Sequence, residues 1–294
     1  MKRALIFPGQ AAQFEGMGRL LVESHVHLND ILDHANDILG FDIRSIMFDG
    51  SAEDLKRTDV TQPAVFIHSY MMLKSRKAVE FEATAGHSLG EITALVAADV
   101  LSFEEGLGLV KTRSELMQEA CKATNGSMAA IIGLEDETVE KICNEVDGIV
   151  VAANYNCPGQ LVISGDMDAL QIATSKMTEA GARRAIILNV GGAFHSALMS
   201  SASKGLAAAI NAINFQAPKC AIYQNVDAKP NTDPELIKAN LIAQLDSPVR
   251  WAQIIQNMIT SGIEEFIEVG GKGNILNGMI RRIDRSAKIE AWKE

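Results

Sequence analysis

The chain has 294 residues, 47% of them hydrophobic and 22% charged, which is the balance of a folded protein with a sizeable core. Its net charge of −10 argues against a nucleic-acid-binding protein and against binding at a membrane surface, because both need a basic face. The four cysteines lack C-x-x-C spacing, so we expect reduced thiols, no disulfide framework and no metal site.

The beginning of the chain predicts a buried strand over residues 4–7, followed by a turn at Pro8-Gly9. This apolar run is too short for a signal peptide, and no stretch reaches the roughly 18–20 apolar residues that span a bilayer. We therefore expect a cytoplasmic protein that does not bind membranes. Helical patterns follow over residues 28–39 and 62–77.

A serine motif comes next, directly after a short predicted strand over residues 82–85. Gly86-His87-Ser88-Leu89-Gly90 has the form G-x-S-x-G, in which a sharp strand-to-helix turn exposes the serine hydroxyl. The flanking glycines leave room for the tight turn, and residues 91–98 are rich in helix formers. Ser88 is therefore the candidate nucleophile.

Arg113 lies in the middle of an apolar stripe on the next predicted helix. That helix opens at Ser102, which forms an S-x-x-E capping box with Glu105. Apolar residues occupy the positions three and four residues before and after Arg113. A buried guanidinium needs an anion, so Arg113 either binds a substrate carboxylate, forms an internal ion pair, or extends its side chain to water.

The middle third predicts a small unit with its own sheet. Strand-like and helical patterns alternate in the order β-α-β-β-α-β, which is typical of a ferredoxin-like fold. The expected segments are residues 127–132, 136–146, 149–153, 161–164, 167–180 and 184–190.

The remaining elements return to alternating helices and strands. They are expected at residues 200–213, 221–224, 248–261, 265–269 and 279–283. Such alternation predicts an α/β protein with a mainly parallel sheet.

His195 is the best of six histidines to act as the base for Ser88. It follows a predicted strand end and Gly191-Gly192, and sites form at such strand ends in open α/β sheets. His87 is adjacent to the serine and points away from it. No acidic residue between Ser88 and His195 stands out as an orienting group, so a backbone carbonyl could hold the imidazole of a Ser–His dyad. The loop Pro8-Gly9-Gln10-Ala11 after the first strand can bring a backbone N–H to an oxyanion, beside the N–H of Leu89.

Taken together, these segments resemble the malonyl-CoA:acyl carrier protein transacylases of type II fatty acid synthesis and the acyltransferase domains of polyketide synthases. The matching motifs run almost from end to end of the chain. They are Phe7-Pro8-Gly9-Gln10, Thr61-Gln62-Pro63-Ala64, Gly86-His87-Ser88-Leu89-Gly90-Glu91, Arg113, Met128-Ala129-Ala130-Ile131, Asn156-Cys157-Pro158-Gly159-Gln160, Gly192-Ala193-Phe194-His195-Ser196 and Ser247-Pro248-Val249-Arg250-Trp251.

The resemblance implies an α/β-hydrolase-like large subdomain, residues 1–124 and 192–294, carrying an inserted ferredoxin-like small subdomain, residues 125–191. It implies that malonyl-CoA is the substrate, that acyl carrier protein is the acceptor and that no cofactor is needed. We expect a monomer. Because the carrier is acidic, a local basic patch is expected to receive it, from among Arg183, Arg184, Lys272, Arg281 and Arg282.

The resemblance also implies roles for the site residues. Ser88 attacks the thioester, His195 is the base, and the N–H groups of Gln10 and Leu89 bind the oxyanion. The remaining roles are carboxylate binding by Arg113, orientation of His195 by the carbonyl of Gln244, and malonyl preference through the bulk of Phe194.

Two loops depart from the pattern of the family. Its Gly-Gln-Gly-Ser-Gln loop is Gly9-Gln10-Ala11-Ala12-Gln13 here, and its Val-Gly-Pro-Gly-Lys segment becomes Val269-Gly270-Gly271-Lys272-Gly273-Asn274. The first departure could shift the oxyanion loop.

Two other functions are compatible with parts of this pattern. A Ser–His site could pass the acyl group to water, as in an esterase or thioesterase, but Arg113 suits a carboxylate and disfavours a neutral acyl chain. A catalytically inactive scaffold that binds the carrier would require the replacement of Ser88 or His195, and both residues are present.

Overall fold

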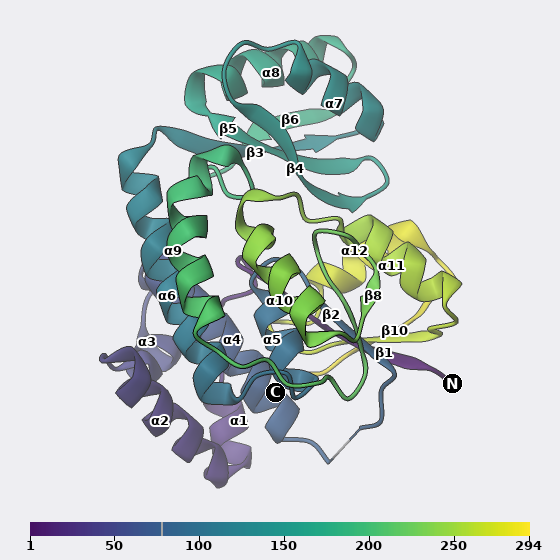
Figure 1. Cartoon of the computed structure of the whole chain (residues 1–294). Coiled ribbons are helices and arrows are strands. Elements are labelled where there is room, and N and C mark those ends of the chain that lie inside the picture. The colour runs from purple at the N-terminus through teal and green to yellow at the C-terminus, as the bar shows by residue number, and fades with distance from the viewer. Residues whose placement is uncertain (78) are drawn as a thin grey trace.

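Two separate β-sheets organise the computed structural model, which describes residues 1–77 and 79–294 (Figure 1). The larger sheet has the strand order β10-β9-β1-β2-β7-β8 and the smaller one the order β4-β5-β3-β6. The strands are β1 (Arg3–Phe7), β2 (Ala83–Gly86), β3 (Gly126–Ile132), β4 (Val150–Cys157), β5 (Gln160–Asp166), β6 (Arg184–Ile187), β7 (Ala221–Tyr223), β8 (Pro230–Asn231), β9 (Glu265–Glu268) and β10 (Lys288–Ala291).

The helices connect these strands and cover the sheets. They are α1 (Arg19–Ser24), α2 (Asn29–Leu39), α3 (Ile43–Asp49), α4 (Thr58–Lys74), α5 (Gly90–Ala97), α6 (Phe103–Ala123), α7 (Asp136–Asn144), α8 (Met167–Glu179), α9 (Ser200–Asn211), α10 (Pro234–Ala243), α11 (Trp251–Thr260) and α12 (Ile275–Ile283).

The larger sheet is mainly parallel, since only β8 pairs antiparallel to its neighbour. Both of its faces are buried, as parallel sheets require. Along β1, Leu5 and Phe7 pack with α4, α5 and α6, whereas Ala4 and Ile6 pack with α11 and α12 on the other face. The carboxyl ends of β1, β2 and β7 therefore meet at one edge of a rigid layer, where the loops that follow them come together.

The smaller sheet is antiparallel and is built from residues 126–187, between β2 and β7 in the sequence. Helices α7 and α8 cover one face, with Ile131, Val139 and Leu170 in the core between them. It lies at the top of Figure 1 and joins the larger part through β4, where the Tyr155 N–H donates to the Val249 carbonyl. The strand order is that of a ferredoxin-like fold. The mainly parallel sheet with a separate second sheet was predicted and is confirmed, whereas the exact subdomain boundaries at residues 125 and 191 stay a prediction.

Most predicted elements are present within two or three residues of their expected ends, and the capping box of Ser102 and Glu105 has both of its hydrogen bonds. Three bounds were wrong. Helix α4 begins at Thr58, so Pro63 lies inside it, β4 continues to Cys157, and α12 begins at Ile275 rather than at residue 279. The apolar pattern of β4 ends at Ala153, and Asn156 bonds to His87 on the larger part of the chain. Helices α1, α3 and α10 and the edge strands β8 and β10 were not predicted.

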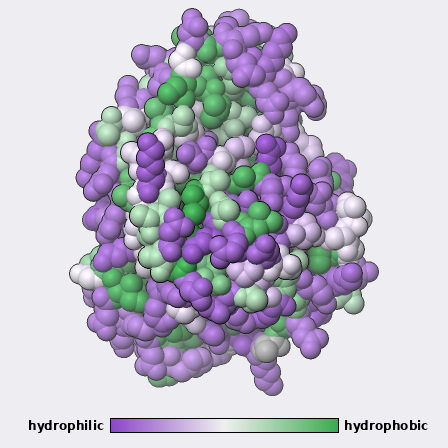
Figure 2. All heavy atoms as spheres, in the orientation of Figure 1, coloured by the Kyte–Doolittle hydropathy of each residue, from purple (hydrophilic) through white to green (hydrophobic). Residues whose placement is uncertain are grey.

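The visible face of the molecule is mostly hydrophilic, with hydrophobic residues showing over the smaller sheet (Figure 2). Exposed apolar side chains of that region include Ile172 of α8, Ile186 of β6 and Val151 of β4. Among the described residues, no helix is both long and apolar enough to cross a membrane.

Candidate active site

Ser88 lies on the turn between β2 and α5, with a φ of 52°. This left-handed conformation is costly for a residue with a side chain and is typical of a strained, functional turn. The glycines on either side are required by packing. A Cβ on Gly86 would lie 1.9 Å from the backbone of Gly90, and one on Gly90 would lie 2.1 Å from the Phe7 carbonyl oxygen. The turn is therefore pressed against the end of β1.

The hydroxyl of Ser88 contacts two of the predicted site residues, which come from distant parts of the chain. Its Oγ lies 2.7 Å from Nε2 of His195, and Nη2 of Arg113 donates to it from 3.0 Å. His195 is in the segment between β6 and α9 and also has a positive φ, of 58°. The three residues that the sequence singled out most strongly are thus brought together.

The other nitrogen of His195 is held by backbone carbonyls. Nδ1 lies 3.1 Å from the carbonyl oxygen of Gln244 and 3.1 Å from that of Ser247. Because both partners are acceptors, Nδ1 carries the hydrogen and Nε2 is free to accept the proton of Ser88. The second carbonyl, that of Ser247, was not predicted, because a loop carbonyl leaves no mark on its own side chain.

Burial keeps His195 neutral. Desolvation, and then the positive charge of Arg113, lower the pKa of His195 to about 3. The imidazole is therefore in its basic form throughout the neutral range, as a general base must be before the reaction starts.

Arg113 is 1% exposed and lies in the middle of α6. Nη1 donates to Oε1 of Gln62 at 2.7 Å, and Nη2 lies 3.5 Å from Oε1 of Gln244. Its Nε is buried without a hydrogen-bond partner among the described residues. Burial lowers the pKa of Arg113 to about 10, while the charge of Glu91 opposes the shift, so the guanidinium stays charged at neutral pH.

Arg113 therefore adopts neither of the two alternatives to carboxylate binding, which were an internal ion pair and a side chain that extends to water. Within the described part of the chain no carboxylate lies within ion-pair distance of it, and its side chain does not reach water. What remains is a buried cation with unused hydrogen-bonding capacity beside the nucleophile, the arrangement that suits a bound anion.

The loop after β1 lies against the serine turn. A Cβ on Gly9 would lie 2.5 Å from the His87 carbonyl oxygen and 3.7 Å from the Leu89 nitrogen. The Ser88 N–H already donates to Oδ1 of Asn225 at 2.7 Å, so it is not free to bind an oxyanion. Gln10 and Leu89 keep their places as candidate donors. Ala11, where the related family has glycine, has a φ of 82°.

A cavity of about 170 Å³ opens at Ser88 between the two sheets. Met117 and Phe194 line it from the larger part of the chain, and Met128 and Val162 line it from the smaller sheet. Phe194 is 7% exposed and adjoins His195, so its ring limits the space beside the nucleophile. The cavity at Ser88 is thus shared by both parts of the chain.

Sequence reasoning missed several polar groups around the nucleophile. Gln62 holds Arg113, Asn225 holds Ser88, and the amide of Gln244 donates from Nε2 to the Ser88 carbonyl at 3.0 Å. The available signal was a polar residue in an apolar helix for Gln62, and a polar residue just after a strand for Asn225.

His87, which we excluded as the base, pairs with Oδ1 of Asn156 at 2.9 Å instead.

The basic residues expected to receive the carrier are dispersed. Arg184 begins β6, and Arg281 and Arg282 lie in the last turn of α12. Nη1 of Arg282 donates to Oε1 of Gln160 at 2.7 Å, which ties α12 to the smaller sheet. Lys272 lies over the ring of Phe14, with 5.1 Å from Nζ to the ring centroid.

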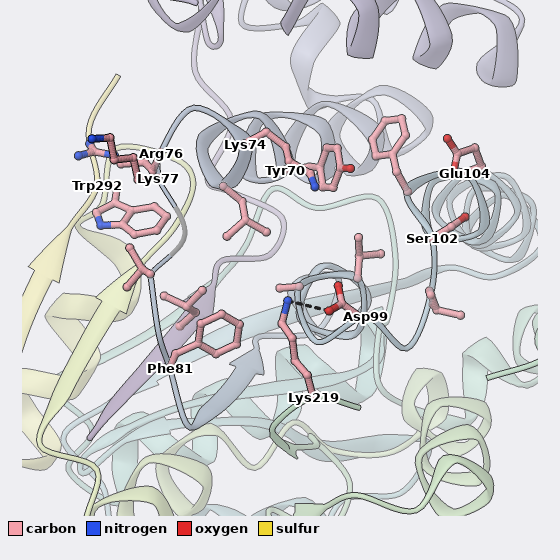
Figure 3. Close-up of a pocket in the computed structure, with 17 residues that line it drawn as sticks. Tyr70, Lys74, Arg76, Lys77, Phe81, Asp99, Ser102, Glu104, Lys219 and Trp292 are labelled. Carbon is pink, nitrogen blue, oxygen red and sulfur yellow. Dashed lines mark ion pairs between the residues drawn. The ribbon is translucent and has the colours of Figure 1, made fainter. Parts of the chain in front are cut away.

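A larger cavity, of about 500 Å³, lies at the other end of α5 from Ser88 (Figure 3). Lys74, Phe81 and Trp292 line it, and Lys219 forms an ion pair with Asp99 at 2.9 Å. It contains none of the predicted site residues, so size alone does not identify the reactive cavity.

Comparisons with known proteins agree with this geometry. The acyl transferase domain family matches residues 4–291. A malonyl CoA-acyl carrier protein transacylase of Staphylococcus aureus (strain MRSA252) is 40% identical over 291 residues, which cover 98% of this chain and 94% of the relative. The crystal structure of an acyl carrier protein S-malonyltransferase from Vibrio cholerae superposes with a TM-score of 0.95 at 39% identity, covering 100% of this chain and 97% of the other.

A further solved structure is that of a type II PKS acyl-carrier protein in complex with its malonyl-transacylase. It superposes with a TM-score of 0.96 at 35% identity and covers 100% of this chain and 96% of the other. The chain is an acyltransferase and belongs to the acyl transferase domain family, within its group of malonyl CoA-acyl carrier protein transacylases.

Proposed function

We propose that the protein transfers the malonyl group of malonyl-CoA to the phosphopantetheine thiol of acyl carrier protein, through a malonyl ester on Ser88. The observation that carries the proposal is the position of the Ser88 hydroxyl, 2.7 Å from the base His195 and 3.0 Å from the buried cation Arg113. A nucleophile, its base and a carboxylate-binding group therefore act on one small space.

In the first half of the reaction, Ser88 Oγ attacks the thioester carbonyl while Nε2 of His195 takes its proton. The N–H groups of Gln10 and Leu89 bind the oxyanion, and collapse of the tetrahedral intermediate breaks the C–S bond. The CoA thiolate leaves with the proton from His195. The second half is the reverse with a new partner: the carrier thiol gives its proton to His195, attacks the Ser88 ester and releases the serine, which recovers the proton. The order is ping-pong, and the residues need no cofactor for it.

Arg113 selects the substrate by charge. A guanidinium with a free Nε and two partly used Nη groups can bind the malonyl carboxylate through two parallel hydrogen bonds. A neutral acyl chain would leave this buried charge without an anion, which disfavours a general esterase or thioesterase. Phe194, on the wall of the 170 Å³ cavity, crowds an α-methyl branch and favours malonyl over methylmalonyl.

The acceptor is proposed from chemistry and similarity together. Relatives named as transacylases of acyl carrier protein, and a carrier-bound neighbour, support a carrier thiol as the acceptor. Arg281 and Arg285 line an open hollow of about 430 Å³, and they join Arg282 as candidates to meet an acidic carrier. We propose that the enzyme acts as a cytoplasmic monomer.

Labelling tests this function directly. The protein is incubated with radiolabelled malonyl-CoA without carrier, digested, and the labelled peptide is identified by mass spectrometry. The label is expected on Ser88, absent from Ser88→Ala, and discharged when holo acyl carrier protein is added. A label on another residue, or transfer without a labelled enzyme, would contradict the malonyl-serine intermediate.

A further inference from the structure

A buried carboxylate lies directly behind the nucleophile, in the first turn of α5. Glu91 is 0% exposed. Its Oε2 accepts the backbone N–H of Asn225 at 2.6 Å, and its Oε1 accepts a hydrogen bond from Nε2 of Gln224 at 3.3 Å. Glu91 thereby fixes the segment that follows β7 to the start of α5. The reaction steps described above do not use this carboxylate.

Asn225 links that carboxylate to the serine turn. Its Oδ1 accepts the Ser88 N–H at 2.7 Å, and its Nδ2 donates to the Gly86 carbonyl at 2.7 Å. Both ends of the side-chain amide are therefore bonded to the backbone of the turn. Asn225 is itself 0% exposed, so water cannot replace these bonds without opening the core.

The turn needs such restraint because Ser88 has a φ of 52°. The left-handed region is strained for a residue with a side chain, and surrounding structure must hold it there. The Ser88 carbonyl is held from the other side by Nε2 of Gln244, at 3.0 Å. With both backbone groups fixed, the Ser88 Oγ is directed between His195 and Arg113.

We propose that Glu91 and Asn225 are positioning residues for Ser88: the carboxylate fixes the backbone of Asn225, and the amide of Asn225 fixes the backbone of Ser88. Neither residue lines the cavity at Ser88. The inference rests on the proposed function only in taking Ser88 as the nucleophile, and it adds two residues that act through the backbone of the turn.

Glu268 provides a matched control for a merely structural role. It is also a buried carboxylate, 1% exposed, and accepts backbone N–H groups of Leu276 at 3.1 Å and Asn277 at 3.0 Å. Its bonds go to the start of α12 rather than to the serine turn. Removing either carboxylate leaves buried amides without an acceptor, so Glu91→Ala and Glu268→Ala are both expected to lower Tm.

The experiment measures the single-turnover rate of Ser88 acylation by malonyl-CoA, the KM for malonyl-CoA, and the rate at which phenylmethanesulfonyl fluoride inactivates Ser88. We expect Asn225→Ala and Glu91→Ala to slow both reactions of Ser88 by about 10²-fold, because small misplacements of a nucleophile have effects of this size, while KM changes little. Glu91→Gln keeps an oxygen that can accept the Asn225 N–H and is expected to recover most of the rate. Glu268→Ala is expected to keep the rates of the unchanged protein.

A crystal structure of Asn225→Ala gives the direct readout, in which Ser88 leaves its left-handed conformation and Oγ moves away from Nε2 of His195. Unchanged reaction rates with unchanged Ser88 geometry in Asn225→Ala would overturn the inference, as would equal losses of rate in Glu268→Ala. The sulfonyl fluoride reaction separates the positioning of Ser88 by Glu91 and Asn225 from the proposed malonyl transfer. It reports how Ser88 is positioned even if malonyl labelling of Ser88 were to fail.

Discussion

Nη2 of Arg113 donates a hydrogen bond to the Oγ of Ser88 across 3.0 Å, so a buried cation and the nucleophile are in direct contact before any substrate arrives. The same guanidinium charge lowers the pKa of His195, whose Nε2 lies on the other side of that oxygen. One side chain thus contacts the proposed nucleophile and also lowers the pKa of its proposed base.

Arg113→Ala is expected to lower kcat/KM for malonyl-CoA by about 10²-fold, because hydrogen bonds to a charged group contribute about 1.5–3 kcal/mol each. Acetyl-CoA, which has no carboxylate, is expected to be used at least as well by the variant as by the unchanged protein. Arg57→Ala, which removes an exposed arginine that precedes α4 and has no proposed role, is the control for general effects of losing a cation. Equal losses with malonyl-CoA and acetyl-CoA would contradict a carboxylate-binding role.

The rate of Ser88 acylation is expected to have no acid limb near the ordinary histidine value. The folded-state pKa of His195 is lowered to about 3, so the neutral base persists as the pH falls well below 6.5. The check is a profile of single-turnover acylation between about pH 8 and about pH 5, where the rate is expected to stay level. A fall in the acylation rate with a midpoint near pH 6.5, assigned to His195, would show that burial and the charge of Arg113 do not lower the pKa of His195.

Glu91 is expected to make the fold less stable as pH rises. Burial raises the pKa of Glu91 from 4.5 to about 7, and the charge of Asp227 adds to the shift, whereas hydrogen bonds from Asn225, Gln244 and Gln224 oppose it. The unfolded chain loses this proton first, so stability falls from about pH 4.5 and the penalty is complete above about pH 7, where it reaches about 3 kcal/mol.

Urea denaturation of the unchanged protein and of Glu91→Gln checks the sign of this effect. The variant cannot titrate at this position, so its stability relative to the unchanged protein is expected to improve between about pH 5 and about pH 8. A constant difference across that range would mean that the folded-state pKa of Glu91 is not raised.

Ala11→Gly is expected to stabilise the protein by about 0.5–1 kcal/mol, because Ala11 has a φ of 82° and glycine adopts this conformation without steric cost. The neighbouring Ala12 is 4% exposed and packs in the core, so Ala12→Gly is the matched control and is expected to destabilise by about 1 kcal/mol. Chemical denaturation measures both. Destabilisation by both variants would show that the left-handed conformation of Ala11 carries no cost.

Local sequence signals located the reactive residues because each has a local cause. The glycines of the serine turn follow from close backbone approach, the capping box of Ser102 marks the start of α6, and the spacing of apolar residues places Arg113 on a buried face. The same kind of signal failed for β4. Near its end, Asn156 is polar and bonds to His87, which is distant in sequence.

By itself the sequence determined the α/β class, the strand–turn–helix around Ser88, and the candidates His195 and Arg113, since these depend on periodicity and on residues adjacent along the chain. Only the tertiary structure decided that the carbonyl of Ser247 joins that of Gln244 in accepting the hydrogen of His195, that Gln62 holds Arg113, and that Glu91 and Asn225 restrain Ser88. These contacts join segments far apart in sequence, and they involve backbone groups that every residue has. Their partners are therefore set by how the sheets and helices pack, and no pattern of side chains along the chain encodes them.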